Sequence, residues 1–161
     1  MGYGRVNPVT ELNKEKKEIP ILEYTVLAAV VIAVFLFIYQ IKTRDVNLAR
    51  SVFGGLVGGR YGVERNIDWE NLRGLDINTG VVYSKFSTEI EKVGYKRAFI
   101  QSFSAGFKYS QGDLKSFVNW RVYSKDSDKI IVAADYQGYN KTLLFAFSKR
   151  GRKLASIQWE Q

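Results

Sequence analysis

Hydrophobic positions follow three successive patterns along the chain, and each pattern predicts a different kind of element. An uncharged run, Tyr24–Ile41, comes first, and apolar residues spaced at threes and fours follow it. Nearer the C-terminus the apolar residues alternate with polar ones. Spacing at threes and fours is the helical period, whereas alternation is typical of strands. The order predicts helices first and a curved antiparallel sheet second, an α+β fold.

The uncharged run predicts a transmembrane helix over residues 19–41. Its 18 residues reach about 27 Å as a helix, close to the ~30 Å thickness of a bilayer's hydrocarbon core. Pro20 suits a first helical turn, and Tyr24 and Tyr39 suit the two interfaces. So uniform an apolar run does not favour a buried core helix. No small-residue cleavage pattern follows the run, which does not favour a cleaved signal peptide. We therefore expect a permanent single-pass anchor.

The segments on either side of this run differ in character. Residues 1–18 are polar and mixed in charge, which predicts a flexible tail. Residues 42–62 carry apolar side chains at helical spacing, such as Val46 and Phe53, which predicts a juxtamembrane helix. Residues 63–161 then form the predicted α+β globular domain.

Two further helices are predicted at the start of this domain. Asp68 is a candidate N-cap for a short helix over residues 69–73, which Gly74 would close. A second helix is predicted within residues 76–94, with Gly94 as its stop. The expected core-facing residues of this second helix are Val82, Phe86, Ile90 and Val93.

From Tyr95 onwards the apolar residues occur at every second position. Phe99, Phe103, Ala105, Phe107 and Tyr109 predict a first strand within residues 95–110. Short polar turns separate the segments that follow, so the pattern predicts an antiparallel meander of four or five strands. The remaining predicted strands are residues 114–124, 129–137, 141–149 and 152–160.

Composition excludes several kinds of chemistry. The 161 residues include no cysteine and no histidine. Disulfides and thiolate nucleophiles are therefore absent, as are the usual general base near neutral pH and the commonest metal ligand. We expect a protein that is not an enzyme and needs no metal or cofactor.

Charge is distributed unevenly. The first 41 residues hold four basic and four acidic residues, so the whole net charge of +8 lies after the apolar run. Basic residues close to the two ends of the run nearly balance, and the positive-inside rule does not fix the orientation. A short polar N-terminus before a C-terminal domain favours an N-in topology, with the domain on the non-cytoplasmic side.

The stretch SVFGGLVGGRYG, residues 51–62, places Gly54, Gly55, Gly58 and Gly59 just beyond the apolar run. A phosphate-binding loop needs a preceding strand and a following Lys-Ser/Thr pair, and both are missing here. Two small-xxx-small pairs are present instead: Gly54 with Gly58, and Gly55 with Gly59. They predict a helix face that another backbone or a neighbouring subunit approaches closely. A kinked or broken helix ending near residue 62 is the alternative.

A basic turn is the second candidate site. Lys149, Arg150, Arg152 and Lys153 lie at a predicted hairpin tip. Such a turn could contact anionic lipid or nucleic-acid phosphate, but a solvated turn that protects the sheet edge explains it more simply. The aromatic residues do not interleave with the cations as a nucleic-acid platform would require, so we do not expect a nucleic-acid partner.

The order of tail, span, helices and curved sheet resembles the nuclear-transport-factor-2-like, or cystatin-like, cone fold on a membrane anchor. Residues 60–86, RYGVERNIDWENLRGLDINTGVVYSKF, look most like the VirB-eight and DotI/IcmL class of type IV secretion and conjugation systems. That resemblance implies a non-catalytic scaffold that self-associates or contacts other subunits of a membrane complex, close to membrane lipids.

Two other functions fit the same pattern. One is an accessory or assembly subunit of a respiratory or protein-import complex. The other is a cone-shaped domain that binds a small molecule or acts as an enzyme, which requires a deep pocket with converging polar groups among the Phe and Tyr residues.

Overall fold

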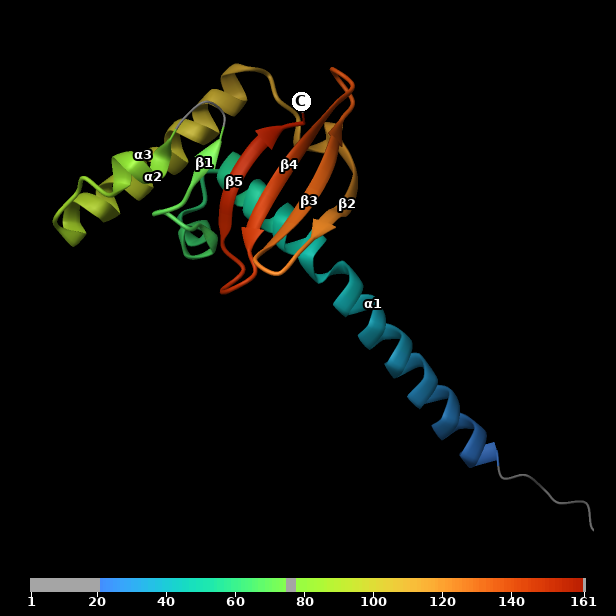
Figure 1. Cartoon of the computed structure of the whole chain (residues 1–161). Coiled ribbons are helices and arrows are strands. Elements are labelled where there is room, and N and C mark those ends of the chain that lie inside the picture. Colours follow the sequence, from blue (N-terminus) through green and yellow to red (C-terminus); the bar gives the residue numbers. More distant parts are fainter. Residues whose placement is uncertain (1–20, 75–77, 161) are drawn as a thin grey trace, which may run out of the picture. The chain divides into compact units, whose positions relative to one another are not determined.

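The computed structural model describes residues 21–74 and 78–160. It divides the chain into two compact units, residues 1–38 and 39–161 (Figure 1). The predicted tail, residues 1–18, lies outside the described residues.

One continuous helix, α1 (Ile21–Val57), covers most of both predicted N-terminal helices, residues 19–41 and 42–62. Its window Tyr24–Ile41 has a mean hydropathy of 2.3, and none of this window is buried. It is the one helix of the described residues that is long and apolar enough to cross a membrane. A core helix of a soluble protein would bury such a surface, whereas here the surface is exposed.

The C-terminal part of α1 is a core element of the second unit. Ala49, Val52, Phe53 and Leu56 are each at most 2 % exposed. Their spacing of three and four places them on one helix face, which lies against the sheet (Figure 1). The helix ends at Val57, before the predicted end at residue 62.

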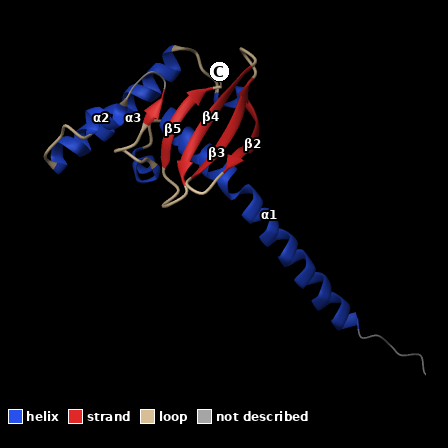
Figure 2. Cartoon of the chain, in the orientation of Figure 1, coloured by secondary structure: helices blue, strands red, loops and turns tan. Residues whose placement is uncertain are grey.

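The sheet has five strands in the order β1-β5-β4-β3-β2 (Figure 2). Strands β2 to β5 form the antiparallel meander that the alternating pattern predicts. The short strand β1 instead pairs in parallel with β5, which makes the sheet mixed. The bounds are β1 Arg73–Gly74, β2 Phe117–Lys125, β3 Lys129–Tyr136, β4 Lys141–Ser148 and β5 Leu154–Trp159.

The predicted strand over residues 95–110 is wrong, because this segment belongs to helix α3 (Glu89–Tyr109). Phe99, Phe103 and Phe107 are four residues apart, and that interval fits both the strand period and the helical period. The helix begins with a capping box in which Thr88 and Glu91 bond each other's backbone N–H groups.

The two predicted helices before α3 are also wrong in their bounds. Residues 69–73 form a turn and then enter β1, while a 3₁₀ helix, η1 (Tyr61–Asn66), precedes them. The side chain of Asp68 accepts from the amide of Asn71 and caps no helix. Within residues 76–94 only α2 (Thr79–Tyr83) and the start of α3 are helical among the described positions, and Gly94 lies inside α3.

Aromatic rings fill the space between α1, α3 and the sheet. Phe53 is at the centre, with ring centroids 4.8 Å from Phe117 and 5.2 Å from Phe145. It also contacts Phe103 and Phe107 of α3 and Trp120 of β2. A short 3₁₀ helix, η2 (Leu114–Ser116), leads from α3 into β2. This packing does not favour a ligand-binding cone.

Candidate functional site

The glycine-rich segment forms the C-terminal cap of α1. Gly59 has a φ of +65°, the left-handed conformation that glycine adopts without strain. The N–H of Gly59 donates to the carbonyl of Leu56 (3.1 Å), and the N–H of Arg60 donates to the carbonyl of Gly55 (2.8 Å). These two bonds are those of a Schellman motif, which satisfies the last carbonyls of a helix.

The four glycines face neighbours within the same chain. A Cβ at Gly55 would lie 2.9 Å from Cβ of Val63 in η1, and one at Gly54 would lie 3.6 Å from Leu114. One at Gly59 would lie 3.4 Å from the Ser104 hydroxyl of α3. One at Gly58 would lie 3.0 Å from the carbonyl oxygen of Gly54. The close approach therefore occurs between α1 and η1, and contact with another subunit through these glycines stays a prediction.

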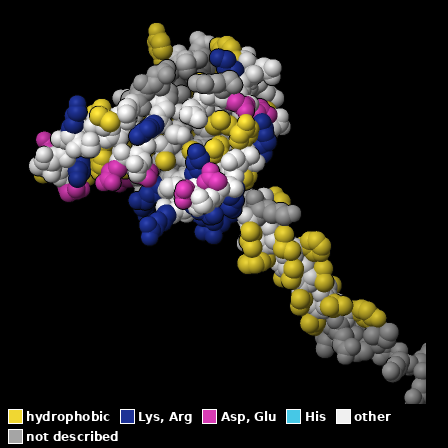
Figure 3. Space-filling model, in the orientation of Figure 1, with side chains coloured by type: hydrophobic (Ala, Val, Ile, Leu, Met, Phe, Trp, Pro, Cys, Tyr) yellow, Lys and Arg dark blue, Asp and Glu magenta, His cyan; other side chains and the backbone are white. Residues whose placement is uncertain are grey.

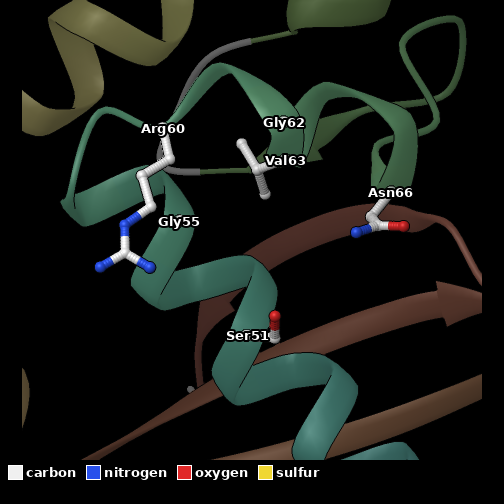
Figure 4. A pocket seen from close by; sticks show the side chains of 6 residues that line it. All are labelled: Ser51, Gly55, Arg60, Gly62, Val63 and Asn66. Carbon is white, nitrogen blue, oxygen red and sulfur yellow. The ribbon is translucent and has the colours of Figure 1, made fainter.

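A small hollow adjoins this cap, with a volume of about 200 Å³. Its lining residues are Ser51, Gly55, Arg60, Gly62, Val63 and Asn66 (Figure 4). In Figure 4 the Arg60 guanidinium and the Asn66 amide lie on either side of Val63, so the polar groups do not converge on one point. We therefore assign no ligand to this hollow.

The contact at Gly55 predicts a specific loss of stability. We expect Gly55→Ala to lower the free energy of unfolding by about 1–3 kcal/mol, because the new methyl group overpacks against Val63. Gly62→Ala is the matched control, since a Cβ there meets nothing within 4 Å. Thermal unfolding of the full chain in detergent, followed by tryptophan fluorescence, measures both. Equal melting temperatures for the two variants would show that α1 and η1 are not packed this closely.

The basic turn lies between β4 and β5 and is tied to α1. Arg152 donates from Nη1 to Oδ1 of Asp45 (2.9 Å), and Lys125 donates from Nζ to Oδ2 of the same carboxylate (3.2 Å). Asp45 is only 6 % exposed. A buried carboxylate is costly unless it is paired, and here each oxygen has its own cation.

The β2–β3 turn lies against the β4–β5 turn. The N–H of Lys149 donates to the carbonyl of Asp128 (2.8 Å), and its Nζ donates to the carbonyl of Asp126 (3.1 Å). The backbone N–H groups of Lys129 and Asp128 donate to the Asp126 carboxylate and hold its pKa below the usual value. The carboxylate therefore stays ionised at neutral pH and keeps the turn closed.

We call the two turns together the basic collar: residues 125–129 and 149–153. It holds six cations and the two carboxylates of Asp126 and Asp128, and Asp45 of α1 binds two of the cations. Figure 3 shows Lys and Arg side chains gathered at the lower edge of the domain. The sequence identified the cations of the second turn, but their proximity to Lys125 and Lys129 follows only from the strand pairing. The collar's six cations are Lys125, Lys129, Lys149, Arg150, Arg152 and Lys153.

A second surface, which the sequence pattern did not identify, lies on the first half of α3. Ile90 is 86 % exposed and Val93 is 38 % exposed, although both were predicted to face the core. They line a shallow groove of about 410 Å³ together with Glu89, Gly94 and Arg97. We call these five residues the α3 stripe. The capping box formed by Thr88 and Glu91 was the signal that could have placed them on one helix.

Among the described residues, no cluster of three or more Asp and Glu side chains could hold a metal ion. The fold thus defines a class: an α+β domain with a mixed five-stranded sheet, preceded by a helix apolar enough to cross a membrane. Comparison of the chain with protein-family models, with curated proteins and with solved structures gave no match.

Proposed function

We propose that this chain is a non-catalytic, single-pass membrane scaffold subunit of a multi-protein membrane complex. In this proposal α1 anchors the chain, and the domain acts through protein contacts of the α3 stripe. The observation that carries it is the solvent exposure of Ile90 and Val93 on an ordered helix of a domain whose core is otherwise filled. A large contiguous apolar patch on a folded domain usually marks an interaction surface, and Ile90 and Val93 lie three residues apart on one helix face.

The stripe is self-complementary, and this favours a second copy of the chain as the occupant. Glu89 and Arg97 lie eight residues apart, about 12 Å along the helix, with Val93 midway between them. Two copies of α3 that cross antiparallel about Val93 bring each Glu89 near the other copy's Arg97. Such a contact is isologous, the usual arrangement in symmetric dimers.

The charges at the ends of the stripe are available for this contact. Glu89 pairs weakly with Lys92 of its own helix, at 3.4 Å, and the Glu89 side chain is still 80 % exposed. The guanidinium of Arg97 lies 5.7 Å from the ring centroid of Tyr61, and Arg97 is exposed. At Gly94 a Cβ would meet nothing within 4 Å, so a second backbone can approach there.

The stripe is small, and an interface of this size is weak in free solution. Anchoring both copies in one membrane raises their effective concentration and strengthens a weak contact without adding new interactions. The proposed anchor therefore makes the proposed contact between α3 stripes stronger than it would be in solution.

The finer assignment within this proposal is a translocation complex of the type IV secretion or conjugation kind, with the domain on the non-cytoplasmic side. It is supported by the element order of anchor, helices and meander and by the local similarity of residues 60–86 to that class.

Affinity purification of the tagged full chain from native membranes tests the proposal. We expect wild type to recover untagged copies and other membrane proteins. Ile90→Glu should reduce the recovery of untagged copies about tenfold, because it places a charge in an apolar contact between copies. Ser102→Glu is the matched control, since Ser102 is exposed on the face of α3 opposite Val93. Mass spectrometry of the recovered proteins distinguishes a secretion complex from a respiratory or import complex.

Two results would contradict the proposal. One is the recovery of no membrane protein with the wild-type chain. The other is that the wild type and the Ile90→Glu variant recover equal amounts of untagged chain.

A further inference from the structure

The basic collar lies close to the end of the apolar window of α1. Asp45, which binds Lys125 and Arg152, follows Ile41 by four residues, about 6 Å along the helix axis. That distance is shorter than the Debye length of about 10 Å at 0.1 M ionic strength. Asp45 and the two cations bound to it therefore lie about one helical turn, along the axis of α1, beyond the end of this window.

The collar carries more positive charge than its own carboxylates neutralise. The collar has six cations and two carboxylates, Asp126 and Asp128, and both oxygens of Asp45 are already bound by Lys125 and Arg152. Asp126 accepts two backbone N–H groups, as noted above. Within the described part of the chain, no ion pair joins Lys129, Arg150 or Lys153 to a carboxylate.

Hydrogen bonds fix the conformation of the β4–β5 turn, which carries the exposed cations Arg150 and Lys153. The N–H of Ser148 donates to the carbonyl of Lys153 (2.9 Å), and its hydroxyl donates to the carbonyl of Arg150 (3.1 Å). The two turns are joined through Lys149 and are tied to α1 through Asp45. Preorganised cations lose less entropy on binding phosphate than cations on a free tail.

We infer that the basic collar binds the phosphate-bearing head groups of anionic lipids in the membrane that α1 crosses. The inference rests on the membrane anchor of the proposed function, but it is independent of the α3 stripe. Anionic lipid is favoured over nucleic acid by the collar's place beside the apolar window. No Phe, Tyr or Trp occurs within residues 125–129 or 149–153, so the collar offers no ring for bases to stack on.

Fluorescence quenching in lipid nanodiscs tests this binding on the full chain. The chain has no cysteine, so Ser127→Cys in the β2–β3 turn accepts a single fluorophore. The discs contain phosphatidylcholine alone, or phosphatidylcholine with about one third phosphatidylglycerol, and each holds the same fraction of head-group spin-labelled lipid. We expect about twofold stronger quenching in the anionic discs, with the difference lost in high salt.

Charge variants and a second label position provide the controls. Lys129→Gln, Arg150→Gln and Lys153→Gln together should reduce quenching in anionic discs to the value in neutral discs. Lys108→Gln, Lys115→Gln and Lys141→Gln remove the same charge elsewhere and should leave it unchanged. A fluorophore at Gln137→Cys, at the opposite end of the sheet, should show no dependence on lipid charge.

The outcomes separate the inference from the proposals above. Equal quenching in neutral and anionic discs, or equal effects of the two triple variants, would overturn lipid binding and leave the anchor intact. Failure of the chain to enter discs at all would overturn the anchor and the lipid inference together. A quenching change caused by single-stranded DNA in neutral discs, without any effect of anionic lipid, would assign the collar to nucleic acid instead.

Discussion

Phe53→Ala is expected to lower the free energy of unfolding of the α+β domain by about 3–5 kcal/mol. The ring is 2 % exposed and contacts five other aromatic rings, from α3, β2 and β4. Its removal leaves a cavity where α1 meets the sheet. A loss of this size lowers the melting temperature by roughly 10–20 °C in a domain of this length.

The measurement is thermal unfolding of the full chain in detergent, followed by tryptophan fluorescence. The signal reports the domain, because Trp69, Trp120 and Trp159 all lie beyond α1. Tyr109→Ala is the matched control: Tyr109 is 92 % exposed, and its loss should change stability by less than about 0.5 kcal/mol. Similar melting temperatures for Phe53→Ala and Tyr109→Ala would show that α1 is not the centre of the core.

Gly74→Ala is expected to have the second largest effect, about 2–4 kcal/mol. Gly74 has a φ of +136°, and a Cβ there would lie 1.7 Å from the carbonyl oxygen of Ile157. That oxygen belongs to the backbone of β5, so it cannot rotate away as a flexible side chain could. The strand β1 must then leave the sheet or carry strain.

The control for this glycine is Gly106→Ala on the exposed surface of α3. A Cβ there meets nothing within 4 Å, so alanine should stabilise the helix by about 0.5–1 kcal/mol. The same unfolding experiment compares the two variants. If Gly74→Ala also raised the melting temperature, the parallel pairing of β1 with β5 would be wrong.

The meander and the apolar helix were predictable because each rests on one unambiguous period. Phe145 and Phe147 alternate with half-buried Ala146 in β4, and the neighbouring strands β3 and β5 likewise carry their apolar residues toward the core. The 18 uncharged residues Tyr24–Ile41 predict a long apolar helix, and they lie within α1. Local sequence therefore accounts for the α+β class.

The region before the meander was less predictable, since its elements depend on contacts distant in the sequence. Phe99, Phe103 and Phe107 satisfy two periods at once, and only the capping box at the start of α3 decides for a helix. Strand β1 exists because Gly74 lies against Ile157 of β5, more than 80 residues away. Propensity within a short window contains no information about such a contact.

The two candidate surfaces show the same limit. The sequence placed Arg150 and Lys153 in a turn, but it did not show that the β2–β3 turn joins them or that Asp45 holds both turns. It assigned Ile90 to the core because an apolar residue at helical spacing is usually buried. The structure places Ile90 in solvent, and a function by protein contact is inferred from that disagreement.

Disulfide cross-linking of the Val93→Cys variant tests most directly whether the α3 stripe is the contact between two copies. The wild-type chain has no cysteine, so a cross-linked product of the full chain in native membranes reports one position only. We predict a disulfide-linked dimer of Val93→Cys under mild oxidation and its loss when Ile90→Glu is added. The Ser102→Cys variant, whose thiol lies about two and a half turns along α3 on the opposite face, should give little dimer. The absence of dimer from Val93→Cys, or an equal yield from Ser102→Cys, would contradict the proposed contact.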